Sequence, residues 1–147
     1  MKTLLLFLKI FNRIRPLLRD VIIPAIQAIN IIKQACRQNM TGEEITWRIE
    51  QFFEHRREAT VAITAMWNVI RNIAPDSSCL KQATPADAIA CFLREIQDRP
   101  KHQQRMVWRE FARALIKYRA PERLWDDAEL DTALQMGYSM SKMKNDE

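Results

Sequence analysis

Apolar residues recur in the middle of the chain at alternating intervals of three and four residues. This alternation is the heptad pattern by which helices pack side by side in bundles and coiled coils. It predicts one long helix over about 42–74 with a bundle seam, a line of positions on one face that contacts a neighbouring helix. The seam consists of Ile45, Ile49, Phe52, Arg56, Ala59, Ile63, Met66, Ile70 and Ile73.

Arg56 is the one charged position in this seam. Its aliphatic stem can pack in the seam while its guanidinium reaches the edge of the bundle. Alternatively, it fixes the register of the helices by pairing with a carboxylate across the bundle. The sequence leaves both interpretations open.

The first 38 residues repeat the same spacing. They predict an amphipathic helix over about 1–38, in which Pro16 opens a second helical piece and Pro24 produces a kink. Further apolar residues, such as Leu5 and Ile10, lie off the repeat and make the apolar face wider than one partner helix covers. We therefore expect a second contact surface on this helix. The repeat runs through Leu4, Phe7, Phe11, Ile14, Leu18, Val21, Ala25, Ala28, Ile32 and Ala35.

A short turn joins these two stretches. Thr41 followed by Glu44 is a capping box, in which the hydroxyl accepts a hydrogen bond from a backbone N–H of the first helical turn. Asn39 is suited to end the preceding helix in a left-handed conformation. Because so short a turn joins two long helices, we expect an antiparallel hairpin about 50 Å long.

Three shorter helices are predicted in the second half of the chain, over about 85–97, 101–119 and 121–136. Thr84, Pro85 and Asp87 supply a cap, a first-turn proline and a first-turn acid for the first of them. We expect Gly137 to end the last helix and residues 138–147 to form a polar tail. The 147 residues include only two glycines, whereas β-sandwiches and barrels use many in their turns. The predicted fold class is a single all-α domain.

The excess positive charge is concentrated near the N-terminus. Residues 1–39 carry seven bases and one acid, Asp20, whereas the remaining residues have a net charge of −1. Such asymmetry favours an anionic membrane surface, a nucleic acid or an acidic protein as a neighbour.

The opening apolar run does not fit a secretory signal, because it stops at Lys9 and no small-residue cleavage site follows. The longest charge-free run in this region, Val21–Ile32, is too short for a bilayer core and contains Pro24. We therefore expect neither a signal peptide nor a transmembrane span.

The chain has three cysteines, an odd number without close spacing: Cys36, Cys79 and Cys91. Each lies in or near an apolar helical pattern, and no pair has the spacing of a zinc site. Buried, reduced thiols are the favoured interpretation. This predicts a reducing compartment, with the protein cytoplasmic or associated with an assembly.

A basic stripe is predicted on the helix at 101–119, where a base recurs every four residues. This spacing is compatible with phosphate contacts along a nucleic acid, although the aromatic residues of the helix fall on its apolar side. The favoured interpretation is a solvated cationic face that pairs with acids of the last helix, in the same molecule or in a second copy. The stripe consists of Lys101, Arg105, Arg109, Arg113 and Lys117.

No arrangement of residues indicates catalysis or a cofactor. His55 and His102 lack the serine or cysteine context of a nucleophile. Glu50, Glu54 and Glu58 share a helix face, but none has the histidine three residues later that di-metal bundles use. We therefore expect a non-enzymatic protein without a metal or cofactor.

These features favour a structural subunit that self-associates or docks into a larger complex, such as a virion or a membrane-associated assembly, through its N-terminal helix. Peripheral binding to an anionic membrane through the same helix is the alternative, and nucleic-acid binding through the basic stripe comes third. The residues expected to contact the partner or the membrane are Leu4, Phe7, Phe11, Ile14, Arg13, Arg15 and Arg19.

Overall fold

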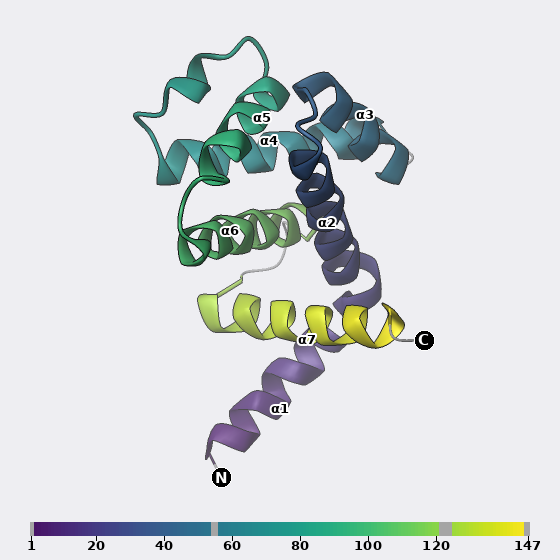
Figure 1. Cartoon of the computed structure of the whole chain (residues 1–147). Coiled ribbons are helices and arrows are strands. Elements are labelled where there is room, and N and C mark those ends of the chain that lie inside the picture. Colours follow the sequence, from purple (N-terminus) through teal and green to yellow (C-terminus); the bar gives the residue numbers. More distant parts are fainter. Residues whose placement is uncertain (1, 54–55, 121–124, 146–147) are drawn as a thin grey trace.

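The structure of the protein is a computed structural model that describes residues 2–53, 56–120 and 125–145 (Figure 1). For residues 2, 3, 6, 7, 56 and 141–145 it describes the backbone alone. These described parts are helical and contain no strand, which confirms the predicted all-α class. The predictions for Glu54 and His55, and those for the side chains of Phe7 and Arg56, lie outside the described residues.

Seven α-helices and three short turns of other helical types follow one another in the described residues. A 3-10 turn (Arg15–Leu17) and a π turn (Leu18–Ile22) separate the first two helices, and a second 3-10 turn (Ser78–Lys81) precedes the fifth. The α-helices are α1 (Lys2–Ile14), α2 (Ile23–Arg37), α3 (Gly42–Phe53), α4 (Arg56–Ile73), α5 (Pro85–Ile96), α6 (Lys101–Arg119) and α7 (Asp127–Asn145).

The predicted long helix over 1–38 is divided by its two prolines. Pro16 lies in the 3-10 turn, and Pro24 lies in the first turn of α2. Because Pro24 has no N–H, it cannot donate to the carbonyl of Asp20 four residues earlier. That carbonyl instead accepts a hydrogen bond from Arg119 Nη2 of α6 at 2.9 Å. The kink is thus stabilised by a side chain from a distant helix.

The predicted long antiparallel hairpin is not confirmed. Helix α1, which precedes the break, packs against α7, whereas α2, which follows it, packs against α3, α5, α6 and α7 (Figure 1). The segment 42–74 is likewise assigned as two helices, α3 and α4, with residues 54–55 between them outside the description. Of the seam, Ile49, Ile63, Met66 and Ile70 are buried and Phe52 is half-buried.

The turn between α2 and α3 has the predicted local structure. Asn39 has a φ of 54°, and the N–H of Met40 donates to the carbonyl of Ala35 at 3.1 Å, which closes the end of α2. Thr41 Oγ1 accepts a hydrogen bond from the N–H of Glu44 at 3.3 Å. The cap of α5 is also confirmed, since Thr84 Oγ1 accepts from the N–H of Asp87 at 3.1 Å.

The last helix ends later than predicted. The sequence predicts it over 121–136, followed by a polar tail at 138–147, but α7 begins at Asp127 and continues through Gly137 to Asn145, and the predicted residues 121–124 lie outside the described residues. Gly137 does not end the helix and instead faces α2 and the π turn before it across a close contact. A Cβ atom built on Gly137 would lie 2.8 Å from Ile22 Cγ2 and closer still to Ile26 Cδ1. The absence of a side chain lets α7 approach α2.

The prediction of three reduced cysteines is wrong for two of them. Cys79, in the 3-10 turn before α5, and Cys91, in α5, form a disulfide. The two cysteines are 12 residues apart in the sequence, and they meet because the 3-10 turn before α5 folds back onto that helix. Cys36 remains a free, buried thiol. The inference of a reducing compartment from unpaired cysteines therefore loses its basis.

We predict that Gly137→Ala destabilises the protein. Alanine is a better helix former than glycine by about 1 kcal/mol, so the substitution would stabilise an exposed helix position. Here the new methyl group would overlap Ile22 and Ile26, and we expect a net loss of about 1–3 kcal/mol in urea unfolding. Ser139→Ala, at an exposed position of the same helix, is the control. Equal or greater stability of Gly137→Ala would contradict the close contact.

We predict that protein purified without reductant carries one free thiol. Alkylation in denaturant should add one group, at Cys36, and alkylation after reduction should add three. In the folded protein Cys36 should react slowly, because burial raises the pKa of its thiol and lowers its thiolate fraction. Since the disulfide closes a loop of about a dozen residues, reduction should lower the free energy of unfolding by about 3 kcal/mol. Three alkyl groups without reduction would refute the pairing.

Candidate functional site

Helix α1 extends from one end of the molecule, where α7 crosses it (Figure 1). Its described leucines are unusually exposed for their size: Leu4 is 63% exposed, Leu5 is 62% exposed and Leu8 is 45% exposed. At about 100° per residue these three positions share one side of the helix. We call them the leucine stripe. An exposed apolar stripe on a projecting helix is a candidate docking surface.

The C-terminal half of α1 belongs to the core. Ile14 is fully buried, and Ile10 and Phe11 are half-buried. Ile14, which the sequence predicted as a partner contact, is therefore unavailable to a partner. Of the predicted apolar contact residues, Leu4 is the most exposed one that the structure describes. The sequence indicated Leu5 only as an apolar residue outside the heptad repeat, and it gave no indication of Leu8 as a contact residue.

The predicted cationic residues near α1 are divided between two environments. Arg13 Nη1 lies 2.9 Å from Glu129 Oε1 of α7, and the Glu129 side chain is only 5% exposed. This ion pair fastens the end of α1 to α7. Arg15 and Arg19 are exposed. The cations thus partly position the helix and partly border it with positive charge.

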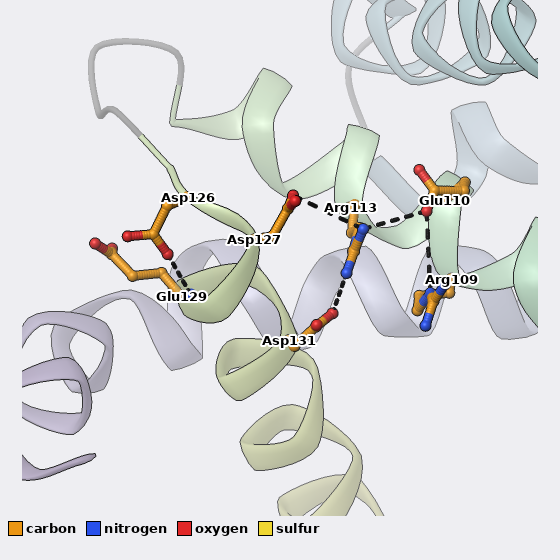
Figure 2. A network of polar contacts seen from close by, with 7 residues as sticks. All are labelled: Arg109, Glu110, Arg113, Asp126, Asp127, Glu129 and Asp131. Carbon is orange, nitrogen blue, oxygen red and sulfur yellow. Dashed lines mark hydrogen bonds and ion pairs between the residues drawn. The ribbon is translucent and has the colours of Figure 1, made fainter. Parts of the chain in front are cut away.

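The beginning of α7 is fixed by its own acids. Asp126 Oδ1 accepts a hydrogen bond from the N–H of Glu129 at 2.7 Å, which caps the helix (Figure 2). Asp127 and Glu129 lie in the first turn, where negative charge is favoured by the helix dipole. This cap holds Glu129 beside α1, where Arg13 binds it.

Arg113 of α6 joins α6 to α7. Its guanidinium donates hydrogen bonds to Asp131 of α7 and, at 3.2 Å, to Glu110 Oε1, and Asp127 Oδ1 lies 3.9 Å away (Figure 2). The Arg113 side chain is 15% exposed, and its Nε is buried without a hydrogen-bond partner. The hydrogen bond to Asp131 raises the pKa of Arg113 above its usual range, so the side chain stays charged. We call these residues the Arg113 network.

The Arg113 network interrupts the predicted basic stripe. Arg113 is enclosed by carboxylates, and Arg109 Nε lies 3.9 Å from Glu110 Oε1. Lys101, Arg105 and Lys117 are exposed. Arg113 thus pairs with an acid of the last helix, Asp131, although its side chain is largely buried and does not belong to a solvated face.

One group in the described residues brings several potential metal ligands together: Cys79, Cys91 and Glu95. Glu95 Oε1 lies 3.3 Å from Cys79 Sγ. Because the two sulfurs are bonded to each other, neither is a thiolate, and thiolate is the form in which cysteine binds metals. The group does not fit a metal site in this state.

None of the described helices combines the length and the apolar character needed to cross a bilayer. Comparison of the chain with protein-family models, with curated proteins and with solved structures finds no match. The functional argument therefore rests on the surfaces described above.

We predict that Asp131→Ala lowers the free energy of unfolding by about 1–2 kcal/mol. The substitution removes the closest carboxylate from a largely buried guanidinium, although the half-exposed position of Asp131 moderates the effect. Asp127→Ala is the control, because Asp127 is 88% exposed and lies farther from Arg113. Its effect should stay within about 0.5 kcal/mol in urea unfolding. Equal losses for the two variants would count against Asp131 as the main partner.

Proposed function

We propose that the protein is a non-enzymatic assembly subunit that pairs with a second copy of itself through α1. The observation that carries the proposal is the leucine stripe, which is exposed on a helix that projects from the molecule. Burying the exposed part of each leucine contributes about 1 kcal/mol, so six leucines in a two-fold pair supply a useful driving force.

The charges around α1 support a second copy as the partner. A hollow of about 460 Å³ beside the helix is bordered by Lys9 and Arg13 on one side and by Asp126 and Glu129 on the other. Both signs of charge thus lie beside α1. Arg13 and Glu129 pair within one molecule, but in a two-fold pair, where the same surface meets itself, the exposed Lys9 of each copy can face the exposed Asp126 of the other.

Peripheral binding to an anionic membrane is the second candidate. It is favoured by the exposed cations Lys9, Arg15 and Arg19, which lie in or directly after the helix that carries the leucine stripe. A helix with leucines on one side and cations on another can lie in a lipid interface. This candidate uses the same stripe as the first, so the two need a measurement that separates them.

We predict that sedimentation velocity shows a concentration-dependent monomer–dimer equilibrium at about 10–100 µM, as expected for an interface of a few leucines. Leu4→Gln/Leu8→Gln should weaken dimerisation at least about tenfold, because it removes apolar area while keeping good helix formers. Trp47→Gln is the control, since Trp47 is 60% exposed on α3, away from α1. A wild-type protein that stays monomeric throughout this range would refute the proposal.

Flotation with phosphatidylserine vesicles distinguishes the two candidates. If the protein is a monomer that floats with these vesicles, and Leu4→Gln/Leu8→Gln abolishes flotation, the result would support membrane binding and contradict dimerisation. Salt gives an independent criterion. Screening weakens attraction between cations and anionic lipid, whereas the hydrophobic contact of a dimer persists at high salt.

A further inference from the structure

A cationic cleft lies between the C-terminal end of α2 and the first half of α6. It has a volume of about 250 Å³ and is lined by Lys33 and Arg37 from α2 and by Lys101, Arg105 and Trp108 from α6. None of its described lining residues is a carboxylate. Among the residues that the structure describes, these four cations form no ion pair. They differ in this from Arg13, Arg113 and Arg119, each of which has a carboxylate within 4.0 Å.

Lys33 occupies the most enclosed position of the four. Its ammonium lies 5.4 Å from the centre of the Trp108 ring, and the side chain is half-buried. Burial, and secondarily the nearby charge of Arg37, lowers the pKa of Lys33 below its usual value. The half-buried ammonium of Lys33 thus lies close enough to the charge of Arg37 to be repelled by it, and an anion bound in the cleft would relieve this repulsion.

The beginning of α6 adds to the positive potential. Helix α6 starts at Lys101, and neither a side-chain cap nor an acid in the first turn neutralises its N-terminal N–H groups. The wall of the cleft is fixed by hydrogen bonds, since Gln97 Nε2 donates to the carbonyl of Cys36 at 2.8 Å and Gln104 Nε2 donates to that of Arg99 at 2.9 Å. These hydrogen bonds hold α2, α5 and the start of α6 in place around the cleft. The N-terminus of α6 beside it favours a bound anion.

A second hollow adjoins this cleft. It has a volume of about 470 Å³ and shares Lys33, Arg105 and Trp108 with the first, while Tyr138 and Leu134 of α7 form its far side. This hollow is also lined by Arg109 and by Asp131. It offers room for the rest of a ligand whose anionic group sits in the cationic cleft.

The geometry points to a site for a compact phosphate-bearing small molecule, with the phosphate held by Arg37, Arg105, Lys33 and Lys101. Guanidinium groups bind phosphate through paired N–H donors, and lysine ammonium groups add charge. A long nucleic acid fits less well, because the next two cations of α6 after Arg105 lie within 4.0 Å of a carboxylate, Arg109 beside Glu110 and Arg113 beside Asp131. The usable charge forms a cluster across two helices rather than a track along one.

The test is calorimetric titration of the full chain with inorganic phosphate, with adenosine triphosphate and with a single-stranded oligothymidylate, all at the same low salt. We expect binding of phosphate or of the triphosphate. Arg37→Gln and Arg105→Gln should each weaken it about tenfold or more, because each removes a charge-assisted hydrogen bond. Lys117→Gln, an exposed cation of α6 outside the cleft, should change it less than about twofold.

Stability measurements separate a binding role from a structural one. If Arg37 and Arg105 serve a ligand, their replacement relieves repulsion and leaves the free protein as stable as the wild type, or more so. Loss of stability in both variants would overturn the proposal. So would the absence of binding to phosphate and triphosphate at millimolar concentration, or equal weakening by Lys117→Gln. An affinity found with the oligonucleotide alone, rising with its length, would assign the surface to nucleic acid instead.

Discussion

Burial of the wide apolar face of α2 is the constraint on which the rest of the structure depends. Ala25, Ile26, Ala28, Ile29 and Ile32 are each 0% exposed, and helices α3, α5, α6 and α7 pack around them. A helix with so wide an apolar face is stable in water only when neighbours cover that face. Helices α3, α5, α6 and α7 therefore form a partial shell around α2, which leaves Asn30, Gln34 and Arg37 exposed.

The wide apolar face of the first 38 residues is used differently in α1 and in α2. In α2 the extra apolar residues are covered by other helices of the same chain, whereas in α1 the leucine stripe is left exposed. The break at 15–22 creates this difference, because it directs α1 away from the shell. Pro24 removes one backbone donor, and Arg119 stabilises the result by binding the freed carbonyl of Asp20. The exposed surface is thus a consequence of how the kink is held.

Features set by a few neighbouring residues were predictable from the sequence. The Thr41 and Thr84 caps, the left-handed Asn39 and the bounds of α6 all follow from side chains that act within one helical turn. Features that need a distant partner were not predictable. The Cys79–Cys91 pair depends on the path of a loop, and the cationic cleft depends on α2 and α6 meeting at Trp108. In the candidate site, the spacing of Leu4 identified it as a contact residue, but the burial of Ile14 required the fold.

The two glycines support the predicted fold class, but their positions have a different role from the one predicted. Their scarcity correctly indicated a helical protein, but the expectation that Gly137 ends a helix treated glycine as a source of backbone freedom. Neither glycine has a positive φ, and the described residue that does is Asn39. A Cβ on Gly42 would lie 2.6 Å from the backbone N of Asp87, as one on Gly137 would crowd α2. Each glycine therefore marks a close approach between helices, one joining α3 to α5 and the other joining α7 to α2. Because α7 also binds α1 through Glu129 and Arg13, the contact at Gly137 helps to set the position from which the leucine stripe projects.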